Sequence, residues 1–288
     1  MDVSIIILNY NTFEYTCQCI QSVIDNTIEV TYEIILVDNA SVECDADLFK
    51  EKFPLIKLIK SDKNLGFSKG CNLGLTHAIG STFLLLNSDV KLIEDSISKC
   101  FNIIHQQIDV LMVGPKTIDE KGLIRPICEA FPSIKNELIK LFRLTNFLSN
   151  NYKKNNLFYN FSNYNEDFIT DWLYGSFLLF KKEALLIFEK NKLPDTFFMY
   201  GEDMEWAYCI HKNGKKVLFT SKTSIIHYGG KSTYFNPNLN LDMIFNNEII
   251  FLRKYFLKTS FKLIIILKSL NYLTRVNFKS ALKYLKEL

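Results

Sequence analysis

Short apolar runs that alternate with helix-like segments are the feature of this chain that most restricts its fold. The runs at 3–8, 33–37, 56–60 and 82–86 are typical of buried strands, because they are rich in Ile, Val and Leu. Segments with helical periodicity separate them, and a helical crossover of this kind joins parallel strands. The alternation therefore predicts an α/β, Rossmann-like fold with a mostly parallel, doubly wound sheet.

The rest of the chain continues this pattern with one interruption. Between 136 and 167 the sequence is rich in Asn, Lys and aromatic residues and has weak periodicity. It predicts a short helix and an irregular, mobile surface loop over a site. Further elements are expected as follows: a helix capped by Thr12 and ending near Asn26, helices at 46–53, 64–79 and 96–106, strands at 110–113, 177–180 and 217–219, a helix from Lys182, and a helix that starts within 197–206 and ends at a C-cap at 213–214.

Residues 237–288 are expected to form a basic, amphipathic helical extension that follows a main domain at 1–236. Lysines interrupt its apolar residues too often for a membrane span, which needs about 20 consecutive apolar residues. Two interpretations stay open. The extension suits an interfacial helix on anionic lipid, and it equally suits a helix that packs on the main domain or on a second copy of the chain in a homodimer.

Charge and cysteine content narrow the class of protein. A net charge of +3 gives no reason to expect a nucleic-acid partner. The seven cysteines are scattered and include no CxxC pair, so a zinc site or a redox pair is disfavoured and a reducing cytosol fits best. No signal peptide is visible at the N-terminus. We therefore expect a cytoplasmic protein, peripheral on the inner face of the membrane if the extension binds lipid.

Polar side chains follow four of the predicted strands. Because the carboxyl ends of parallel strands share one edge of a sheet, these side chains can converge on one ligand. Turn formation alone could explain each group, and Asn87 to Asp89 could simply turn the chain and cap the next helix. Two carboxylates at strand ends are harder to explain in this way. The groups are Asn9-Tyr10-Asn11, Asp38-Asn39, Asn64 to Lys69, and Asn87-Ser88-Asp89.

The means of binding phosphate is restricted by two absent motifs. No GxGxxG follows the first strand and no Walker A sequence is present, which disfavours a nicotinamide-dependent dehydrogenase. A divalent cation held by Asp89 would neutralise a diphosphate instead. Asp38 could accept the imide N–H of uracil or thymine, Tyr10 could stack on the base, and Lys69 could place a charge near phosphate.

At this point the chain resembles a known family. The segments VSIIILNYN, ILVDNAS, NLGFSKGCNLG, FLLLNSDV, WLYGSFLLFKK, FFMYGEDMEW and HYGGKS occur in the order found in the family 2 inverting glycosyltransferases. The likeness is to the rhamnosyltransferase-like branch, which has a GT-A fold, and it spans residues 3–232. The resemblance implies transfer of a sugar from a UDP- or dTDP-sugar to a hydroxyl of a glycan or lipid-linked acceptor in surface polysaccharide synthesis.

The resemblance also implies roles for single residues. Asp203 would be the catalytic base with Glu202 as the alternate, and Asp89 and His227 would hold Mg²⁺ or Mn²⁺ near the diphosphate. Asn87 departs from the aspartate common at the start of the DXD motif and would be a weaker or water-mediated ligand. Trp172 and Trp206 are assigned to the acceptor. The nucleotide would be bound by Asn9, Tyr10, Asn11, Asp38, Asn64, Lys69 and Ser88.

Structural interpretations compete with these roles. Glu202 and Asp203 could complement a helix N-terminus, and His227 could be a hydrogen-bonded core residue. Trp172, Trp206 and Gly175 could serve packing, and Lys231 and Ser232 could be solvated loop residues. A catalytically degenerate nucleotide-sugar-binding or scaffold protein is the alternative function, supported by Asn87. The choice of sugar and acceptor is expected to depend on residues 116–171.

Overall fold

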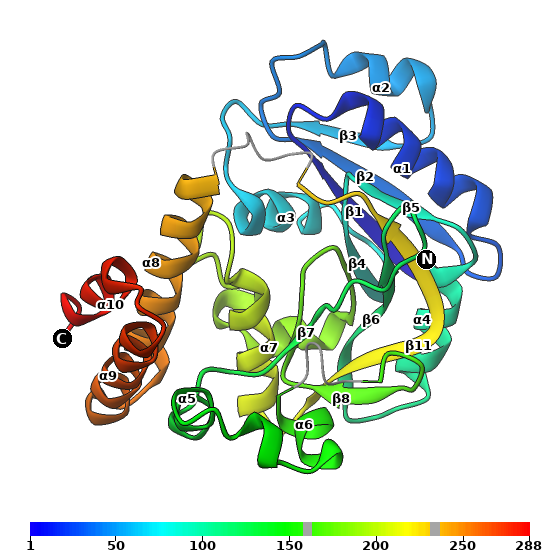
Figure 1. Cartoon of the computed structure of the whole chain (residues 1–288). Coiled ribbons are helices and arrows are strands. Elements are labelled where there is room, and N and C mark those ends of the chain that lie inside the picture. Colours follow the sequence, from blue (N-terminus) through cyan, green and yellow to red (C-terminus); the bar gives the residue numbers. More distant parts are fainter. Residues whose placement is uncertain (158–162, 231–236) are drawn as a thin grey trace. The chain divides into compact units, whose positions relative to one another are not determined.

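The computed structural model describes residues 1–157, 163–230 and 237–288, and the chain divides into two compact units (Figure 1). The first unit comprises Met1–Cys128 and Asn163–Asn236, and the second comprises Glu129–Ser162 and Pro237–Leu288. The second unit thus contains an internal segment in addition to the C-terminal one. The functional division at residue 236 stays a prediction.

The first unit is built on a nine-stranded sheet in the order β3-β2-β1-β4-β10-β6-β11-β5, with β8 also paired to β11. A separate two-stranded sheet joins β7 (Cys128–Glu129) and β9 (Trp172–Leu173). The strands of the large sheet are β1 (Val3–Asn9), β2 (Tyr32–Asp38), β3 (Lys57–Lys60), β4 (Thr82–Asn87), β5 (Val90–Leu92), β6 (Val110–Ile118), β8 (Phe168–Thr170), β10 (Phe177–Lys181) and β11 (Lys216–His227).

Strand direction confirms the predicted α/β class and adds one feature. Strands β3, β2, β1 and β4 pair in parallel, and so do β6 and β11. Strand β10 lies between these groups and is antiparallel to both β4 and β6. All five residues of β10 are buried, so its continuous apolar run does not reveal its direction.

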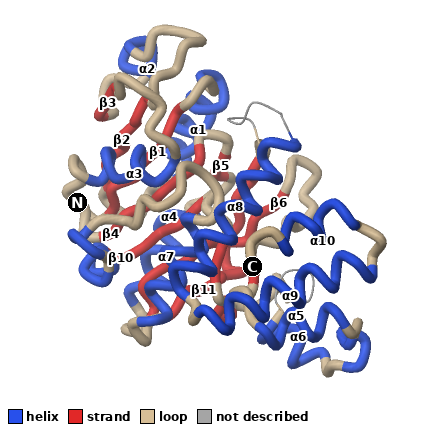
Figure 2. Tube along the Cα trace, turned by 90° about the vertical axis from the view of Figure 1, so that its left-hand side faces the viewer, coloured by secondary structure: helices blue, strands red, loops and turns tan. Residues whose placement is uncertain are grey.

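Helices cover both faces of this sheet (Figure 2). On one face, Ile5 and Ile7 belong to a core shared with α1 (Phe13–Asn26), α2 (Asp47–Lys52) and α4 (Ser96–His105). On the other face, α3 (Phe67–Leu75) lies against β1 so closely that a Cβ on Gly70 would come 2.5 Å from Leu8 Cδ1. Alternate residues of β1 therefore serve opposite cores, which explains its uninterrupted hydrophobicity.

Several expected elements differ in the structure. The expected helix from Lys182 is a 3₁₀ segment, η3 (Lys182–Ile187). The Thr12 side chain makes no capping hydrogen bond, and Asp95 rather than the Asn87–Asp89 triplet caps α4 by accepting from Ser98 N–H. The triplet is instead followed by β5. The helix α7 (Glu202–Lys212) ends as predicted, with Asn213 at its C-cap.

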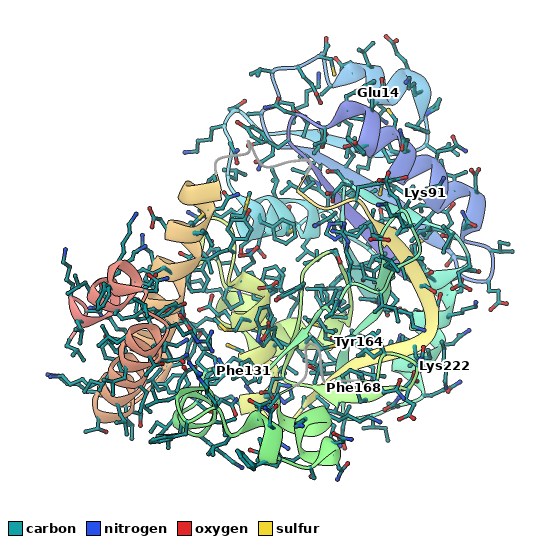
Figure 3. The ribbon with its side chains drawn as sticks, in the orientation of Figure 1. Glu14, Lys91, Phe131, Tyr164, Phe168 and Lys222 are labelled. Carbon is teal, nitrogen blue, oxygen red and sulfur yellow. The ribbon has the colours of Figure 1, made fainter. Side chains whose placement is uncertain are left out.

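The region expected to be irregular is largely helical. It contains α5 (Ile134–Leu141), the 3₁₀ segment η1 (Leu144–Phe147) and α6 (Asn150–Asn156), while 158–162 lie outside the described residues. Further on, Tyr164 and Phe168 pack edge to face, and both contact Phe219 of β11 (Figure 3). These aromatic contacts anchor the chain as it re-enters the first unit.

The second unit is helical throughout its regular structure. The C-terminal segment forms α8 (Pro237–Tyr255), α9 (Lys258–Thr274) and α10 (Phe278–Leu285). Its apolar core includes Ile249, Ile264 and Tyr284. Within this core Lys268 pairs with Glu248 at 2.8 Å and with Glu137 of α5 at 3.4 Å, which ties the internal segment to the C-terminal helices. None of the helices in the described ranges has the length and apolar composition that a membrane span requires.

Candidate active site

The ends of β1, β2 and β4 lie side by side, as the sequence predicted. In the parallel registers, Asn9 is the partner of Asp38 and Leu8 is the partner of Asn87. The carboxyl ends of these strands therefore bring the polar residues that follow β1, β2 and β4 to one edge of the sheet. This edge is the candidate site.

Asn9 is the centre of a buried hydrogen-bond network. Its side chain, in a residue only 1% exposed, donates to Asp38 Oδ1 at 2.8 Å and to Ser41 Oγ at 2.9 Å. Its oxygen accepts from Thr12 Oγ1 and Thr16 Oγ1, at 3.1 and 2.7 Å. Because both amide hydrogens and both lone pairs are used, Asn9 has no capacity left for a ligand. It positions Asp38 instead of binding the nucleotide itself.

Asp38 and Asn11 hold the loop that follows β2. Asp38 is 5% exposed, and its second oxygen accepts from Ser41 N–H at 3.2 Å. Asn11 has a positive φ of 53° and accepts from Val42 N–H at 2.8 Å, while its own N–H donates to Ser41 Oγ. Tyr10, between these anchors, is half-buried. The Asn11 side chain therefore shapes the loop, and Tyr10 keeps exposed surface for a ligand.

A second turn at this edge is held by amides. Asn39 donates to Asn64 Oδ1 at 2.9 Å and accepts from Leu65 N–H at 2.9 Å. Gly66 has a φ of +76°, and a Cβ there would come 2.3 Å from the Phe198 carbonyl oxygen, so only glycine fits. Lys69 lies exposed on the first turns of α3. Asn64 thus fixes the turn, and Lys69 is free to reach toward an anion.

The end of β4 supplies a buried carboxylate beside an imidazole. Ser88 Oγ lies 3.0 Å from Thr12 Oγ1, so Thr12 links this strand end to Asn9. Asp89 is 2% exposed, and its Oδ1 lies 3.1 Å from His227 Nε2. Strand pairing explains the contact, because His227 is the register partner of Val90. The structure therefore brings together Asp89 and His227, the two residues that were predicted to hold one cation.

The first turn of α7 carries two acidic residues with different surroundings. Asp203 is partly exposed and accepts from Gly175 N–H at 3.1 Å, whereas Glu202 is 6% exposed and its Oε2 has no hydrogen-bond partner among the described residues. Burial raises the pKa of Asp203 to about 6, although the N–H groups of Met204 and Gly175 oppose the shift. Burial and the nearby Asp203 raise the pKa of Glu202 well above its usual value.

A short backbone segment connects this helix with the end of β4. Gly175 donates to Asp203 Oδ2, and the next residue, Ser176, accepts from Asn87 N–H at 3.0 Å. A Cβ on Gly175 would lie 3.7 Å from Asp203 Oδ2, an ordinary contact distance. Asp203 and Asn87 are thus held by adjacent residues of one segment. The structure therefore brings the end of β4 and the N-terminus of α7 into one site.

The two tryptophans occupy different environments. Trp206 has no exposed surface, donates from Nε1 to the Pro194 carbonyl oxygen at 2.9 Å, and stacks on Phe67 at 6.2 Å. Trp206 therefore packs in the protein interior and holds α7 in place, as the packing interpretation predicted. It does not contact an acceptor, so its assignment to the acceptor is corrected. Trp172 is half-buried, contacts Tyr174, and its Nε1 makes no hydrogen bond among the described residues.

Sequence reasoning missed several residues that hold the site. The sequence predicts only a helix cap for Thr12 and no site role for Thr16 or Ser41, and it predicts a ligand contact rather than a supporting role for Asn39. Some of their hydrogen bonds join residues far apart in the chain, 76 positions for Thr12 and Ser88 and 26 positions for Asn39 and Leu65. The one available signal was the position of Asn39 directly after Asp38. Lys231 and Ser232 of the HYGGKS segment lie outside the described residues.

Comparison with solved structures identifies the fold class. A mannosyltransferase from Pyrobaculum calidifontis in complex with GDP-Man and Mn²⁺ matches with a TM-score of 0.61 at 14% identity, over 98% of this chain and 74% of that one. TarS from S. aureus matches with a TM-score of 0.57 at 14% identity, over 94% of this chain. The present chain spans only 44% of the TarS chain. The fold is the GT-A glycosyltransferase fold.

Sequence comparison identifies the family. The profile described as "Glycosyl transferase family 2" matches residues 4–182, so the chain belongs to that family and is a glycosyltransferase. The N-acetylglucosaminyl-diphospho-decaprenol L-rhamnosyltransferase of Mycobacterium tuberculosis is 20% identical over 234 residues, 76% of this chain and 74% of its own. These findings confirm the family and the likeness to its rhamnosyltransferase-like branch.

Proposed function

We propose that the protein is an inverting glycosyltransferase that moves a sugar from a nucleotide-diphospho-sugar, UDP- or dTDP-linked, to a hydroxyl of a glycan or lipid-linked acceptor in surface polysaccharide synthesis. The observation that carries the proposal is the Gly175–Ser176 segment, which joins the carboxylate of Asp203 to the end of β4. This end also carries Ser88 and Asp89. This connection supports a base at Asp203 close to a diphosphate site at the end of β4.

Asp203 takes the proton of the acceptor hydroxyl in this proposal. As the acceptor oxygen bonds to the anomeric carbon, the bond from that carbon to the diphosphate breaks and the nucleotide diphosphate leaves with the electron pair. A carboxylate with a pKa of about 6 is ionised at neutral pH and is a better base than an ordinary aspartate. Glu202 is the weaker candidate, because burial favours its protonated form.

A divalent cation, Mg²⁺ or Mn²⁺, is proposed at Asp89 and His227. Carboxylate and imidazole are both ligands for such ions, and Mg²⁺ commonly uses one or two carboxylates together with substrate phosphates. No group of three or more His, Cys, Asp or Glu residues suited to a metal occurs among the described residues, so donor oxygens would complete the set. When bound, the ion would stabilise negative charge on the diphosphate. Asn87 would contribute through water.

The nucleotide is proposed to lie over the ends of β1 and β2. Asp38 retains lone pairs beyond the bonds from Asn9 and Ser41, so it can accept the imide N–H of uracil or thymine. Tyr10 would stack on the base and Lys69 would face phosphate. Asn9, Asn11, Asn64 and Ser88 support these contacts through the hydrogen bonds described above. Trp172 remains the proposed acceptor contact.

The experiment that tests this function is a donor screen. The full chain is incubated with UDP-, dTDP- and GDP-sugars, with Mg²⁺, Mn²⁺ or chelator, and nucleotide diphosphate release is measured. We expect one donor class to be used and release to require a cation. The variant Asp203→Asn should lower kcat by about a thousandfold while donor binding is kept, as expected for loss of a general base. The exposed Asp109→Asn is the matched control.

Two outcomes would overturn separate parts of the proposal. Full transfer by Asp203→Asn would remove the assigned base, and donor binding unaffected by chelator and by Asp89→Ala would remove the cation site. The alternative, a degenerate nucleotide-sugar-binding or scaffold protein, rests on Asn87 in place of the usual aspartate. It predicts donor binding without release for every sugar tested. A cytoplasmic location belongs to this proposal as well.

A further inference from the structure

The helix α9 has an apolar stripe on its exposed side in addition to its buried one. Leu263, Ile266, Leu270 and Leu273 follow a three-four-three spacing and so share one side of the helix. Each of them is 38% to 42% exposed. The buried side of the same helix is formed by other residues, among them Ile264 and Ile265, which have no exposed surface. A helix packed only within its own unit does not need the second stripe.

The helix α10 repeats this arrangement. Ala281 and Tyr284 face inward, and Ser269 of α9 donates to the Ala281 carbonyl oxygen at 3.0 Å. The exposed side of α10 carries Phe278, Leu282 and Leu285, which are 60%, 57% and 41% exposed. We call these three residues and the four of the α9 stripe the outer face. Large apolar side chains gathered in this way mark an interaction surface.

The segment that carries the outer face has an excess of positive charge. Residues 237–288 hold nine Lys and Arg residues against three Asp and Glu residues, while the whole chain has a net charge of only +3. All three acidic residues are used internally, because Asp242 pairs with Lys283, Glu287 with Arg253 and Glu248 with Lys268. The basic residues that form no ion pair among the described residues are Lys258, Lys262, Arg275, Lys279 and Lys286.

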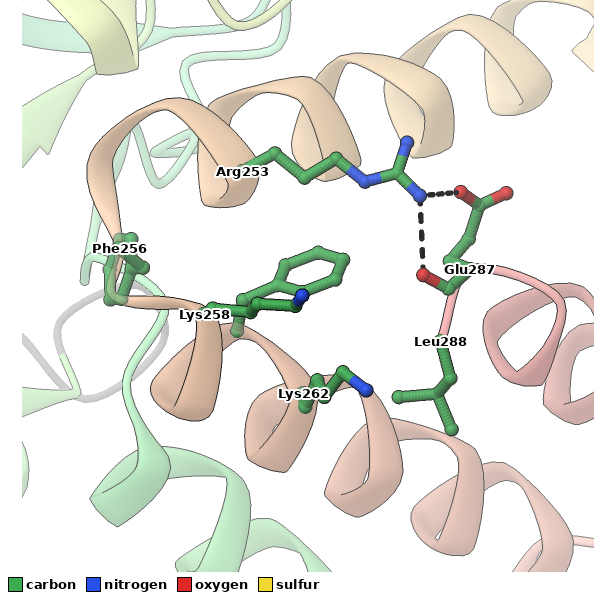
Figure 4. A pocket seen from close by; sticks show the side chains of 7 residues that line it. Arg253, Phe256, Lys258, Lys262, Glu287 and Leu288 are labelled. Atoms are coloured by element: carbon green, nitrogen blue, oxygen red, sulfur yellow. Dashed lines mark hydrogen bonds and ion pairs between the residues drawn. The ribbon is translucent and has the colours of Figure 1, made fainter.

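A basic hollow lies at the start of α9 (Figure 4). It has a volume of about 300 Å³, and its lining includes Arg253, Lys258 and Lys262 together with the ring of Phe261. Arg253 is already bound to Glu287 at 2.8 Å, whereas the two lysines form no ion pair with a carboxylate in the part of the chain that the structure describes. Lys262 precedes Ile266 by one helical turn, so the hollow borders the outer face.

We propose that the outer face docks on the surface of an anionic lipid bilayer, with its apolar side chains in the acyl boundary and its lysines among the headgroups. Exposed apolar residues together with basic side chains on the same helices are typical of interfacial helices. A second copy of the chain is a poorer occupant, because it would bring the same unpaired cations to the interface. The proposal goes beyond the proposed transferase activity and does not depend on it.

Vesicle flotation of the full chain tests the proposal. Phosphatidylcholine vesicles are compared with vesicles that also contain phosphatidylglycerol, at low and high salt. We expect binding to the anionic vesicles only, weakened by salt. Each lysine near the surface should contribute about fivefold, so Lys258→Gln with Lys262→Gln should weaken partitioning by roughly twenty-five-fold. Ile266→Ser with Leu270→Ser should weaken it by about tenfold or more.

Matched controls come from the first unit. Lys50→Gln with Lys63→Gln removes two exposed lysines, and Leu55→Ser with Ile108→Ser removes two exposed apolar side chains that are 100% and 83% exposed. Neither pair should change flotation. Because serines in α9 could unfold the unit, thermal melting accompanies each variant, and the lysine pair tests the proposal independently.

Several results would overturn the docking proposal. These are no binding to anionic vesicles, equal binding to both vesicle types, or equal weakening by the control pairs. A dimer in light scattering that Ile266→Ser with Leu270→Ser dissociates would assign the outer face to a second copy instead. Because flotation needs no donor or acceptor, its failure is distinguishable from failure of the proposed transferase activity.

Discussion

The two units hold their buried carboxylates in opposite ways. At the sheet edge of the first unit, Asp38 accepts from the amide of Asn9 and Asp203 accepts from Gly175 N–H, both neutral donors. In the second unit, Glu137 and Glu248 share the ammonium group of Lys268. Neutral donors fix the position of a carboxylate but leave its charge uncompensated, so that it can serve a ligand. A buried lysine cancels that charge within the fold.

The pKa values follow this difference. Burial raises the pKa of Asp203 to about 6, because the N–H groups beside it compensate only part of the desolvation. Burial would also raise the pKa of Glu248, but the Lys268 ammonium outweighs it and the net shift is downward. The first arrangement leaves a base that can take up a proton near neutral pH. The second leaves a carboxylate that stays charged and contributes to structure alone.

Removal of the buried lysine should give the largest effect. Lys268→Met leaves Glu248 buried without a cation and leaves Glu137 with only the exposed Lys140 as its partner, which should destabilise the chain by about 3 kcal/mol. Denaturant unfolding measures the change, and the triple variant with Glu137→Gln and Glu248→Gln should recover part of it. The exposed Lys286→Met serves as the control. A Lys268→Met protein as stable as the wild type would show that these carboxylates do not depend on the lysine.

The candidate site at the sheet edge could be predicted from the sequence better than the helical unit, for a physical reason. An apolar run in the sequence indicates a buried parallel strand, and the polar residues that follow such a strand must lie at the carboxyl edge of the sheet. Asp38 and Asp89 could therefore be placed there from the sequence alone. Nothing comparable identifies Lys268 as a buried residue. Its partner Glu137 is distant in sequence, and the charged pattern of residues 237–288 equally predicts a fully solvated face.

The sequence also did not reveal the direction of strand β10 or the contacts by which residues near the site support one another. The run at β10 is apolar because both of its faces are buried, which hides its antiparallel direction. Asn9 was expected to bind the nucleotide, and only its four hydrogen bonds reveal a positioning role. Trp206 was likewise placed at the acceptor, although it has no exposed surface. Residue type indicated a polar or aromatic site, but burial decides which residues touch a ligand.

A smaller effect is expected where a neutral donor is removed. Asn9→Ala takes away the amide that orients Asp38 and leaves Thr12 and Thr16 without their acceptor. Donor binding should weaken by about tenfold, since a lost buried hydrogen bond costs roughly 1–3 kcal/mol. Calorimetric titration with the accepted nucleotide measures it.

Asn26→Ala is the matched control for this prediction. The Asn26 side chain also makes two hydrogen bonds, to the carbonyl oxygens of Ser22 and Leu92. The control should lose stability but keep donor affinity. Equal loss of affinity in both variants would mean that Asn9 acts only through general stability.

The smallest effect is expected from Glu202→Gln. Its pH profile must be compared with that of the wild-type protein, and the comparison of the two profiles is the sharpest test of the difference between the units. Asp203 must be ionised to act as the base, so kcat/KM should fall by half near pH 6 and by about tenfold at pH 5. The folded-state pKa of Asp203 lies above the ordinary value for an aspartate, so the contribution of Asp203 to stability increases as pH falls through this window. A decrease in kcat/KM between pH 6 and pH 5 therefore reports protonation of Asp203 and not unfolding caused by its titration.

The variant Glu202→Gln tests whether the acidic neighbour of Asp203 is protonated or ionised. Burial and Asp203 raise its pKa, so it should be protonated at neutral pH, and glutamine copies a protonated carboxyl in shape and charge. Glu202→Gln should therefore change kcat by less than about threefold and leave the acid limb near pH 6. If Glu202 were ionised, its removal would lower the pKa of Asp203 and move the limb to lower pH. Such a shift would mean that a neighbouring charge, that of Glu202, sets the pKa of Asp203. The two units would then differ only in the sign of the neighbouring charge, which is negative beside Asp203 and positive beside Glu248.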